Sequence, residues 1–248
     1  MITRKSAAEI ATMRRAGRVV AEVLALVEDE LRPGVSTAQL DALAEAHIRK
    51  SGATPSFKGY YGYPSSLCIS IDREVVHGIP GDRVIREGQV VSVDAGAIVD
   101  GWHADAARTF VVGNVVQPVR DLVDATRRAL EAGVAAATPG NRIWDVSAAV
   151  EDVALPRGYG VVRPYVGHGI GTAMHEEPQV PNYRTRTRGI ELAPGICLAI
   201  EPMFTLGSAD VETLGDGWTV VTSDGSIAAH WEDSIAVTEN GPEVLTRP

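Results

Sequence analysis

Apolar residues recur at helical spacing through the first fifty positions, in two runs separated by Pro33-Gly34. Ser6 and Ser36, each followed three residues later by Glu or Gln, have the form of capping boxes that open the two runs. The apolar face of the first run consists of Ile10, Met13, Val20, Leu24, Val27 and Leu31. The second run ends at Gly52. We therefore expect two helices that meet at a Pro-Gly turn.

The same arrangement returns in the second half of the chain. A helix is expected from about residue 118, followed by Pro139-Gly140 and by another helix that closes at Gly158. The spacing from Pro33 to Gly52 is the same as that from Pro139 to Gly158. Random recurrence of Pro-Gly pairs would seldom give this match. The helices therefore indicate an internal repeat.

A short apolar strand follows the helix pair in each half, one from Gly88 to Asp94 and one from Gly195 to Glu201. Each strand places a carboxylate six residues after a glycine. We infer a single α+β domain over residues 1–248 that contains a duplication, roughly 6–113 and 118–241. If the halves pack around a pseudo-twofold axis, Asp94 and Glu201 meet at its centre.

Composition and charge exclude several classes of protein. The chain has 248 residues and is 45% hydrophobic, enough for an ordinary core, and its 23 basic against 32 acidic residues give a formal charge of -9. This charge is opposite to that of a nucleic-acid binder. The first residues lack an apolar signal core, and no apolar run is as long as a membrane span, so we expect a cytoplasmic protein. Cys68 and Cys197 favour reduced, buried thiols over a disulfide.

Two aspartates lie on either side of an expected hairpin turn. Asp100-Gly101 is a strong hairpin signal, and it lies between Asp94 and Asp105. The hairpin would bring Asp94 and Asp105 onto neighbouring strands. Taken alone, however, such a pair is most often a solvated surface feature.

The second half supplies His168, Glu201 and Glu232 in similarly suggestive surroundings. Glu201 ends an apolar strand and precedes a proline, where a buried carboxylate needs a cation or a proton. If Asp94, Asp105, Glu201 and Glu232 converge, each close pair of like charges costs about 4 kcal/mol at an effective dielectric constant near 20. No lysine or arginine stands in these motifs. Two divalent cations are the natural neutralisers, and the oxygen-rich set suits Mn, Fe or Co and, less plainly, Zn.

The histidines divide by their context. His47 on the second expected helix is read as a surface group, and His103 and His230 lie two residues before an acidic position, a spacing that on a strand only places them on the same face. His77, His168 and His175 instead lie in Gly- and Pro-rich segments after strands, where chemistry tends to reside. These three are the candidate functional histidines.

Six motifs, in this order, are similar to those of the methionine aminopeptidases. They are His77-Gly-Ile-Pro, the spacing of eleven from Asp94 to Asp105, Gly167-His168-Gly-Ile-Gly171, His175-Glu-Glu-Pro-Gln-Val, Ile200-Glu201-Pro-Met203, and Glu232 before Ile235-Ala-Val-Thr-Glu-Asn-Gly. The resemblance covers nearly the whole chain and implies the duplicated pita-bread fold, a central antiparallel sheet covered by helices. The chain resembles the bacterial first type, because no segment after His175 can hold the helical insertion of the second type.

The resemblance also implies roles for individual residues. Asp94 would bind one metal ion, His168 and Glu201 the other, and Asp105 and Glu232 would bridge them. A water or hydroxide between two divalent ions (Co, Mn, Fe or Zn) would be the nucleophile, with Glu201 as general base. His175 would hydrogen-bond the scissile amide and the oxyanion, and His77 would assist near the leaving side. Tyr60, Tyr63, Cys68, Met203 and Trp218 would surround the methionine side chain, although by sequence alone they are ordinary core residues.

The implied function is hydrolysis of the initiator methionine from nascent polypeptides with small second residues. The implied partners are peptides with N-terminal methionine and nascent chains, with the ribosome exit region as a further candidate, and no nucleic acid or membrane. A monomer is the default state. Two alternatives stay open: a proline-directed aminopeptidase or prolidase with the same metal centre, and a non-catalytic pita-bread protein that binds other proteins. Such non-catalytic relatives lose ligands, whereas ligand-capable residues occupy all five positions here.

Overall fold

The computed structural model describes residues 2–247. Its helices are α1 (Ala7–Glu30), α2 (Thr37–Lys50), α3 (Gln117–Ala136) and α4 (Ile143–Ala154), with short 3-10 helices at Tyr60–Gly62 and Leu155–Arg157. Both predicted capping boxes form, with the hydroxyls of Ser6 and Ser36 accepting from the backbone N–H three residues later. Helix α3 lacks such a side-chain cap and begins instead with a proline in its first turn. The four helices therefore begin and end close to the predicted positions.

Strands in the first half are β1 (Thr54–Pro55), β2 (Leu67–Ile71), β3 (Glu74–Val76), β4 (Val90–Val99) and β5 (Trp102–Val111). Those in the second half are β6 (Gly160–Val161), β7 (Gly167–Gly169), β8 (Glu176–Val180), β9 (Cys197–Ile200), β10 (Met203–Thr205), β11 (Val211–Thr213), β12 (Val220–Thr222), β13 (Ala228–His230), β14 (Asp233–Thr238) and β15 (Gly241–Val244). Every pairing among these strands is antiparallel.

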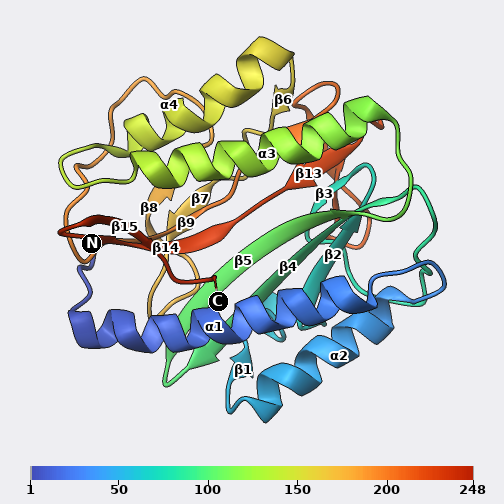
Figure 1. Ribbon diagram of the computed structural model, residues 1–248, viewed down its shortest axis with the longest axis horizontal. Coiled ribbons are helices and arrows are strands. Elements are labelled where there is room, and N and C mark those ends of the chain that lie inside the picture. The colour runs from blue at the N-terminus through green and yellow to red at the C-terminus, as the bar shows by residue number, and fades with distance from the viewer. Residues whose placement is uncertain (1, 248) are drawn as a thin grey trace.

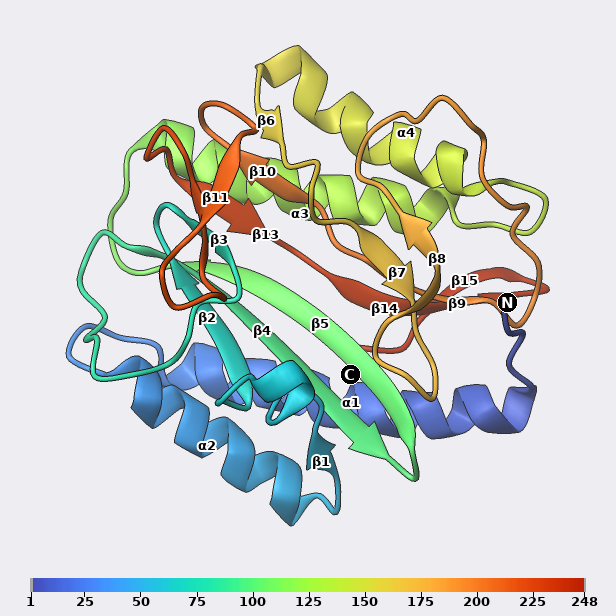
Figure 2. The same cartoon turned by 180° about the vertical axis from the view of Figure 1, so that it is seen from behind.

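The strands form four small sheets, in the orders β1-β4-β2 with β5 beside β4, β13-β10-β6, β11-β12-β3 and β15-β14-β9-β7-β8. The third sheet joins a strand of the first half, β3, to two strands of the second. Helices α1 and α3 lie in front of the strands in Figure 1 and behind them in Figure 2. Helix α1 contacts β4 and β5, and α3 contacts β13. This is the predicted α+β pita-bread arrangement of antiparallel sheets covered by helices.

Each half of the chain has its own hydrophobic core. The first is built from buried residues between Ala16 and Val112, and the second from buried residues between Leu122 and Val237. The halves meet where β5 lies against the start of β14: the backbones of Ala107 and Glu232 exchange hydrogen bonds. Two smaller apolar clusters, one around Met13 and one around Val76, join residues of both halves. Separate main cores are compatible with a duplication, which stays a prediction.

The C-terminal segment fastens the junction between β5 and β14. Asp233, fully buried, accepts hydrogen bonds from Thr246 (2.8 Å) and from the guanidinium groups of Arg108 (2.7 Å) and Arg247 (2.8 Å). Arg108 also donates to the carbonyl oxygen of Glu232. Residues 246 and 247 therefore help to hold the backbone from which Glu232 projects.

The two cysteines are free and buried, as predicted. Between residues 2 and 247, no helix has both the length and the apolar character needed to cross a membrane.

Candidate metal centre and substrate pocket

The β4–β5 hairpin carries the two aspartates of the first half. Its turn is Asp100-Gly101, and both residues have positive φ (48° and 79°), as a two-residue type I′ turn requires. Asp94 pairs with Ala107, and Asp105 pairs with Gly96. The two aspartates are thus diagonal neighbours on one face of the hairpin, where side chains still reach each other. The expected proximity of Asp94 and Asp105 is confirmed.

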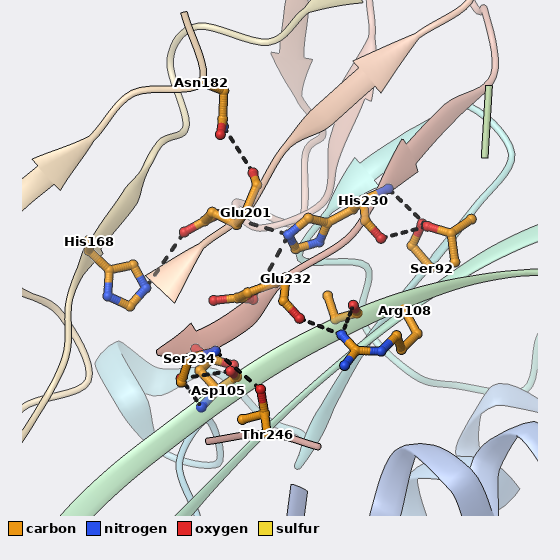
Figure 3. Close-up of polar contacts among 12 residues, drawn as sticks. Ser92, Asp105, Arg108, His168, Asn182, Glu201, His230, Glu232, Ser234 and Thr246 are labelled. Atoms are coloured by element: carbon orange, nitrogen blue, oxygen red, sulfur yellow. Dashed lines mark hydrogen bonds and ion pairs between the residues drawn. The ribbon is translucent and has the colours of Figure 1, made fainter. Parts of the chain in front are cut away.

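Three adjacent strands of the second half supply the other candidate ligands. His168 lies on β7, Glu201 directly follows β9, and Glu232 directly precedes β14. The pairing places His168 opposite Ala199 and the residue after Glu232 opposite Ile200, so these side chains emerge at one end of the sheet. Ser234 on β14 bonds both the N–H and the carbonyl oxygen of Asp105. Figure 3 shows His168, Glu201, Glu232 and Asp105 around a common centre.

The carboxylates at this centre lack partners for several of their oxygen atoms. Asp105 and Glu232 are 4% and 2% exposed. Oδ1 of Asp94, Oδ1 of Asp105 and Oε1 of Glu232 are buried without a hydrogen-bond partner in the part of the chain that the structure describes. A buried polar atom without a partner is costly, and groups of this kind cluster at functional sites. These oxygens fit cations that the protein itself does not provide.

Burial and mutual repulsion disfavour the ionised forms of the four carboxyl groups at this centre. Burial, reinforced by the charge of Asp105, raises the pKa of Asp94, Glu201 and Glu232 well above the usual range. Burial also raises the pKa of Asp105 to about 7. Arg108 lies nearby but does not relieve this repulsion, because its guanidinium is paired with Asp233. A divalent ion would reverse these shifts by favouring the charged carboxylates.

His168 is oriented to offer a lone pair to this centre. Its Nδ1 lies 2.9 Å from the carbonyl oxygen of Gly169, which can only accept, so Nδ1 carries the proton and Nε2 does not. Nε2 lies 3.6 Å from Oε1 of Glu201. Ligand atoms of Asp105, His168 and Glu232 also lie within 4.8 Å of one another. Metal-ligating histidines have this second hydrogen bond to a carbonyl or carboxylate, so the donor set fits divalent metal ions.

His77 and His175 stand above the carboxylates at the pocket wall. Nδ1 of His175 lies 2.8 Å from the hydroxyl of Tyr60, and its ring lies 4.3 Å from that of His168. His77 packs edge-on against Tyr165 and has a left-handed backbone (φ 61°), an unusual conformation that often marks functional sites. Burial lowers the pKa of His77 to about 4 and that of His175 below its usual value. Both rings are therefore neutral at neutral pH.

His47 and His103 both lie outside the pocket. His47 pairs with Glu22 on the surface between α1 and α2, as predicted. His103 is buried and bonds Ser56 at 3.0 Å. Neither side chain lines the pocket.

A cavity of about 270 Å³ leads from the surface to the carboxylates, at the small end of the range for ligand sites. Its wall includes Tyr60, Tyr63, Cys68, His77, His175 and Trp218, as predicted, together with all five candidate ligands. Met203 does not line the cavity. It is fully buried among valines of β3 and β12, because β10 points its side chain away from the cavity and into that cluster. The assignment of Met203 to the pocket lacks support.

Sequence reasoning missed three wall residues, Tyr61, Tyr165 and Val166. Tyr61 adjoins the predicted Tyr60, and the other two directly precede the motif around His168, so proximity in sequence was the available signal. Phe57 and Met174 also line the cavity. Together with Tyr63 and Cys68 they form a buried apolar cluster suited to an unbranched thioether.

Residues 11–239 match metallopeptidase family M24, almost the whole chain. The chain belongs to this family. Its relatives include the methionine aminopeptidase of Clostridium perfringens, 48% identical over 99% of both chains, and methionine aminopeptidase 1 of Bacillus subtilis, 46% identical over 100% of both. These are members of M24 that span the same length as this chain.

Solved structures agree with this assignment. Methionine aminopeptidase from Thermotoga maritima superposes with a TM-score of 0.98 at 43% identity, over 100% of both chains. Prolidase from Pyrococcus furiosus has a TM-score of 0.80 at 24% identity and shares the fold alone, since this chain covers only 65% of it. The full-length agreement with the aminopeptidase distinguishes the two.

Proposed function

We propose that this M24 enzyme removes the N-terminal methionine from polypeptides whose second residue is small. The observation that carries the proposal is a small apolar and aromatic cavity that ends at unpartnered, buried carboxylate oxygens. The full-length relatives are methionine aminopeptidases, which supports this activity over that of a prolidase.

Asp94, Asp105, His168, Glu201 and Glu232 are the residues that would hold two divalent ions, as Co, Mn, Fe or Zn. When bound, such ions supply Lewis acidity and lower the pKa of water toward neutrality. The close donor set of Asp105, His168 and Glu232 and the unpartnered oxygen of Asp94 support this assignment. The number and identity of the ions belong to the proposal.

The protein's own groups would complete the reaction. The Glu201 carboxylate accepts the proton of the attacking water, because it lies at the centre and is only partly exposed (12%). The Tyr60 hydroxyl lies 2.8 Å from Nδ1 of His175, and we assign it the donor role. This assignment leaves the proton on Nε2 of His175, where it would stabilise the developing oxyanion. His77, neutral and held in an unusual backbone conformation, serves the leaving side. Tyr63, Cys68, Met174 and Trp218 enclose the methionine side chain and exclude water.

The proposal is tested by comparing cleavage of Met-Gly-Met-Met with cleavage of an X-Pro peptide. The protein is first treated with a chelator, and Mn or Co is then added. We expect cleavage of the first peptide alone, and we expect Glu201→Gln to lower kcat by at least about a hundredfold. Exclusive cleavage of the X-Pro peptide would instead identify a proline-directed enzyme. If the wild type and the variant are both free of metal and equally inactive, the chain is instead a non-catalytic binding protein.

Three further expectations belong with this proposal: a cytoplasmic location, a monomeric state, and contact with nascent chains near the ribosome exit region.

A further inference from the structure

His230 is a buried histidine that points into the proposed metal centre, although the ligand set above does not include it. It is the last residue of β13 and is 2% exposed. Its Nε2 lies 3.9 Å from Oε2 of Glu201 and 3.9 Å from Oε2 of Glu232. Figure 3 shows the ring beside these two carboxylates, with a dashed line from its nitrogen to each. Within residues 2–247, Nε2 has no hydrogen-bond partner.

The backbone of His230 is fixed from both sides. Its N–H donates to Oγ1 of Thr109 at 2.9 Å, and the Thr109 hydroxyl donates to its carbonyl oxygen at 2.6 Å. Ser92 bonds the same hydroxyl oxygen at 2.8 Å. Strands β4 and β5 thus fix the backbone position of His230, and its buried ring has a nitrogen directed at Glu201 and Glu232.

The two carboxylates divide their oxygens between His230 and the metal centre. In Glu201, Oε1 lies toward the ligand nitrogen of His168 (3.6 Å), whereas Oε2 is the oxygen nearest His230. In Glu232, Oε2 faces His230 and Oε1 is buried without a partner. Each carboxylate thus keeps one oxygen for a cation. Carboxylates that bind metals commonly accept a hydrogen bond on their other oxygen.

We propose that His230 is a positioning residue that donates its Nε2–H to Oε2 of Glu201 and Glu232 and holds both carboxylates in ligating orientation. A lone pair on Nε2 would face two negative oxygens, whereas a proton there attracts both. The 3.9 Å separations need to shorten by roughly 1 Å to become ordinary hydrogen bonds. Such contacts tighten when an active site is completed.

The inference rests on the proposed metal centre, and His230→Gln and His230→Ala test it. Glutamine keeps a neutral N–H donor, and alanine removes it. Titration calorimetry with Mn²⁺ and the visible absorption of the Co²⁺ form report on the site without a turnover measurement. His47→Gln on the surface is the matched control. If wild-type protein binds neither ion, the proposed function fails before any variant is compared.

We expect His230→Ala to weaken metal binding about ten- to a hundredfold with unchanged Co²⁺ band positions, and His230→Gln to recover most of the loss. If both variants shift the Co²⁺ bands alike, His230 is itself a ligand and the proposal is overturned. Unchanged affinity in His230→Ala also overturns it.

If the alanine variant does not fold, the wild type still provides a test. In Zn-loaded protein with ¹⁵N-labelled histidine, the Nε2 resonance of His230 is expected to be that of a protonated nitrogen with its directly bonded proton visible. An unprotonated, metal-bound Nε2 refutes the donor role.

Discussion

Replacing Asp105 by asparagine should stabilise the metal-free protein, even though it damages the proposed metal centre. Burial raises the pKa of Asp105 from 3.8 to about 7. Since the folded-state pKa is the higher one, the folded protein binds the proton more tightly, and stability falls as pH rises from about 4 to about 7. Compared with a side chain that does not titrate, Asp105 then lowers the free energy of unfolding by about 4 kcal/mol at pH 8. Near pH 4.5 it lowers this free energy by only about 1 kcal/mol.

Asparagine keeps the shape of the side chain and removes this titration. In excess chelator at pH 8, Asp105→Asn is expected to raise Tm by about 10 °C, because each kcal/mol is worth about 2–4 °C for a protein of this size. Near pH 4.5 the gain should shrink to a few degrees. Thermal unfolding followed by circular dichroism measures both values, and Asp82→Asn on the surface is the control.

Two results would refute the reasoning: a gain that does not depend on pH, or a variant less stable than wild type at pH 8. Adding Mn²⁺ provides the complementary measurement. Wild type should then gain stability by mass action, whereas the variant, with one charged ligand fewer, should gain less.

Three other substitutions test separate parts of the structure. Asp233→Asn removes the buried anion that pairs two arginines and should cost about 3 kcal/mol in urea unfolding; a loss below about 1 kcal/mol would contradict the importance of this network. Gly17→Ala should destabilise by about 1–3 kcal/mol rather than show the usual helix gain, because the new methyl would collide with the Leu245 carbonyl; a higher Tm would refute this. Tyr60→Phe should lower kcat five- to tenfold with KM nearly unchanged, since His175 loses the bond of about 1 kcal/mol that fixes its tautomer; an unaltered kcat would disprove that role.

The sequence was most informative where local rules apply. Capping boxes and Pro-Gly pairs located the helices, and Asp100-Gly101 fixed the hairpin register that brings Asp94 and Asp105 together. The candidate ligands followed from motifs at strand ends. All five line one cavity.

Features that depend on packing between distant segments could not be predicted. The spacing of His230 and Glu232 suggested only a shared strand face, whereas β13 ends at His230 and Glu232 lies in the short link before β14, so the ring faces the carboxylates. Arg108 was not recognised as a neighbour of the centre, because its partner Asp233 is far away in sequence. The burial of Met203 among valines was likewise not predictable, because the side to which β10 turns its side chains depends on its pairing with β13.

The anchoring of Asp233 by Thr246 and Arg247 also means that substitutions outside the cavity can act on it. A change at residue 246 or 247 would loosen the backbone at Glu232 without altering any candidate ligand. A survey of random variants should therefore reveal defects at these two positions, although neither side chain lines the cavity that ends at the carboxylates.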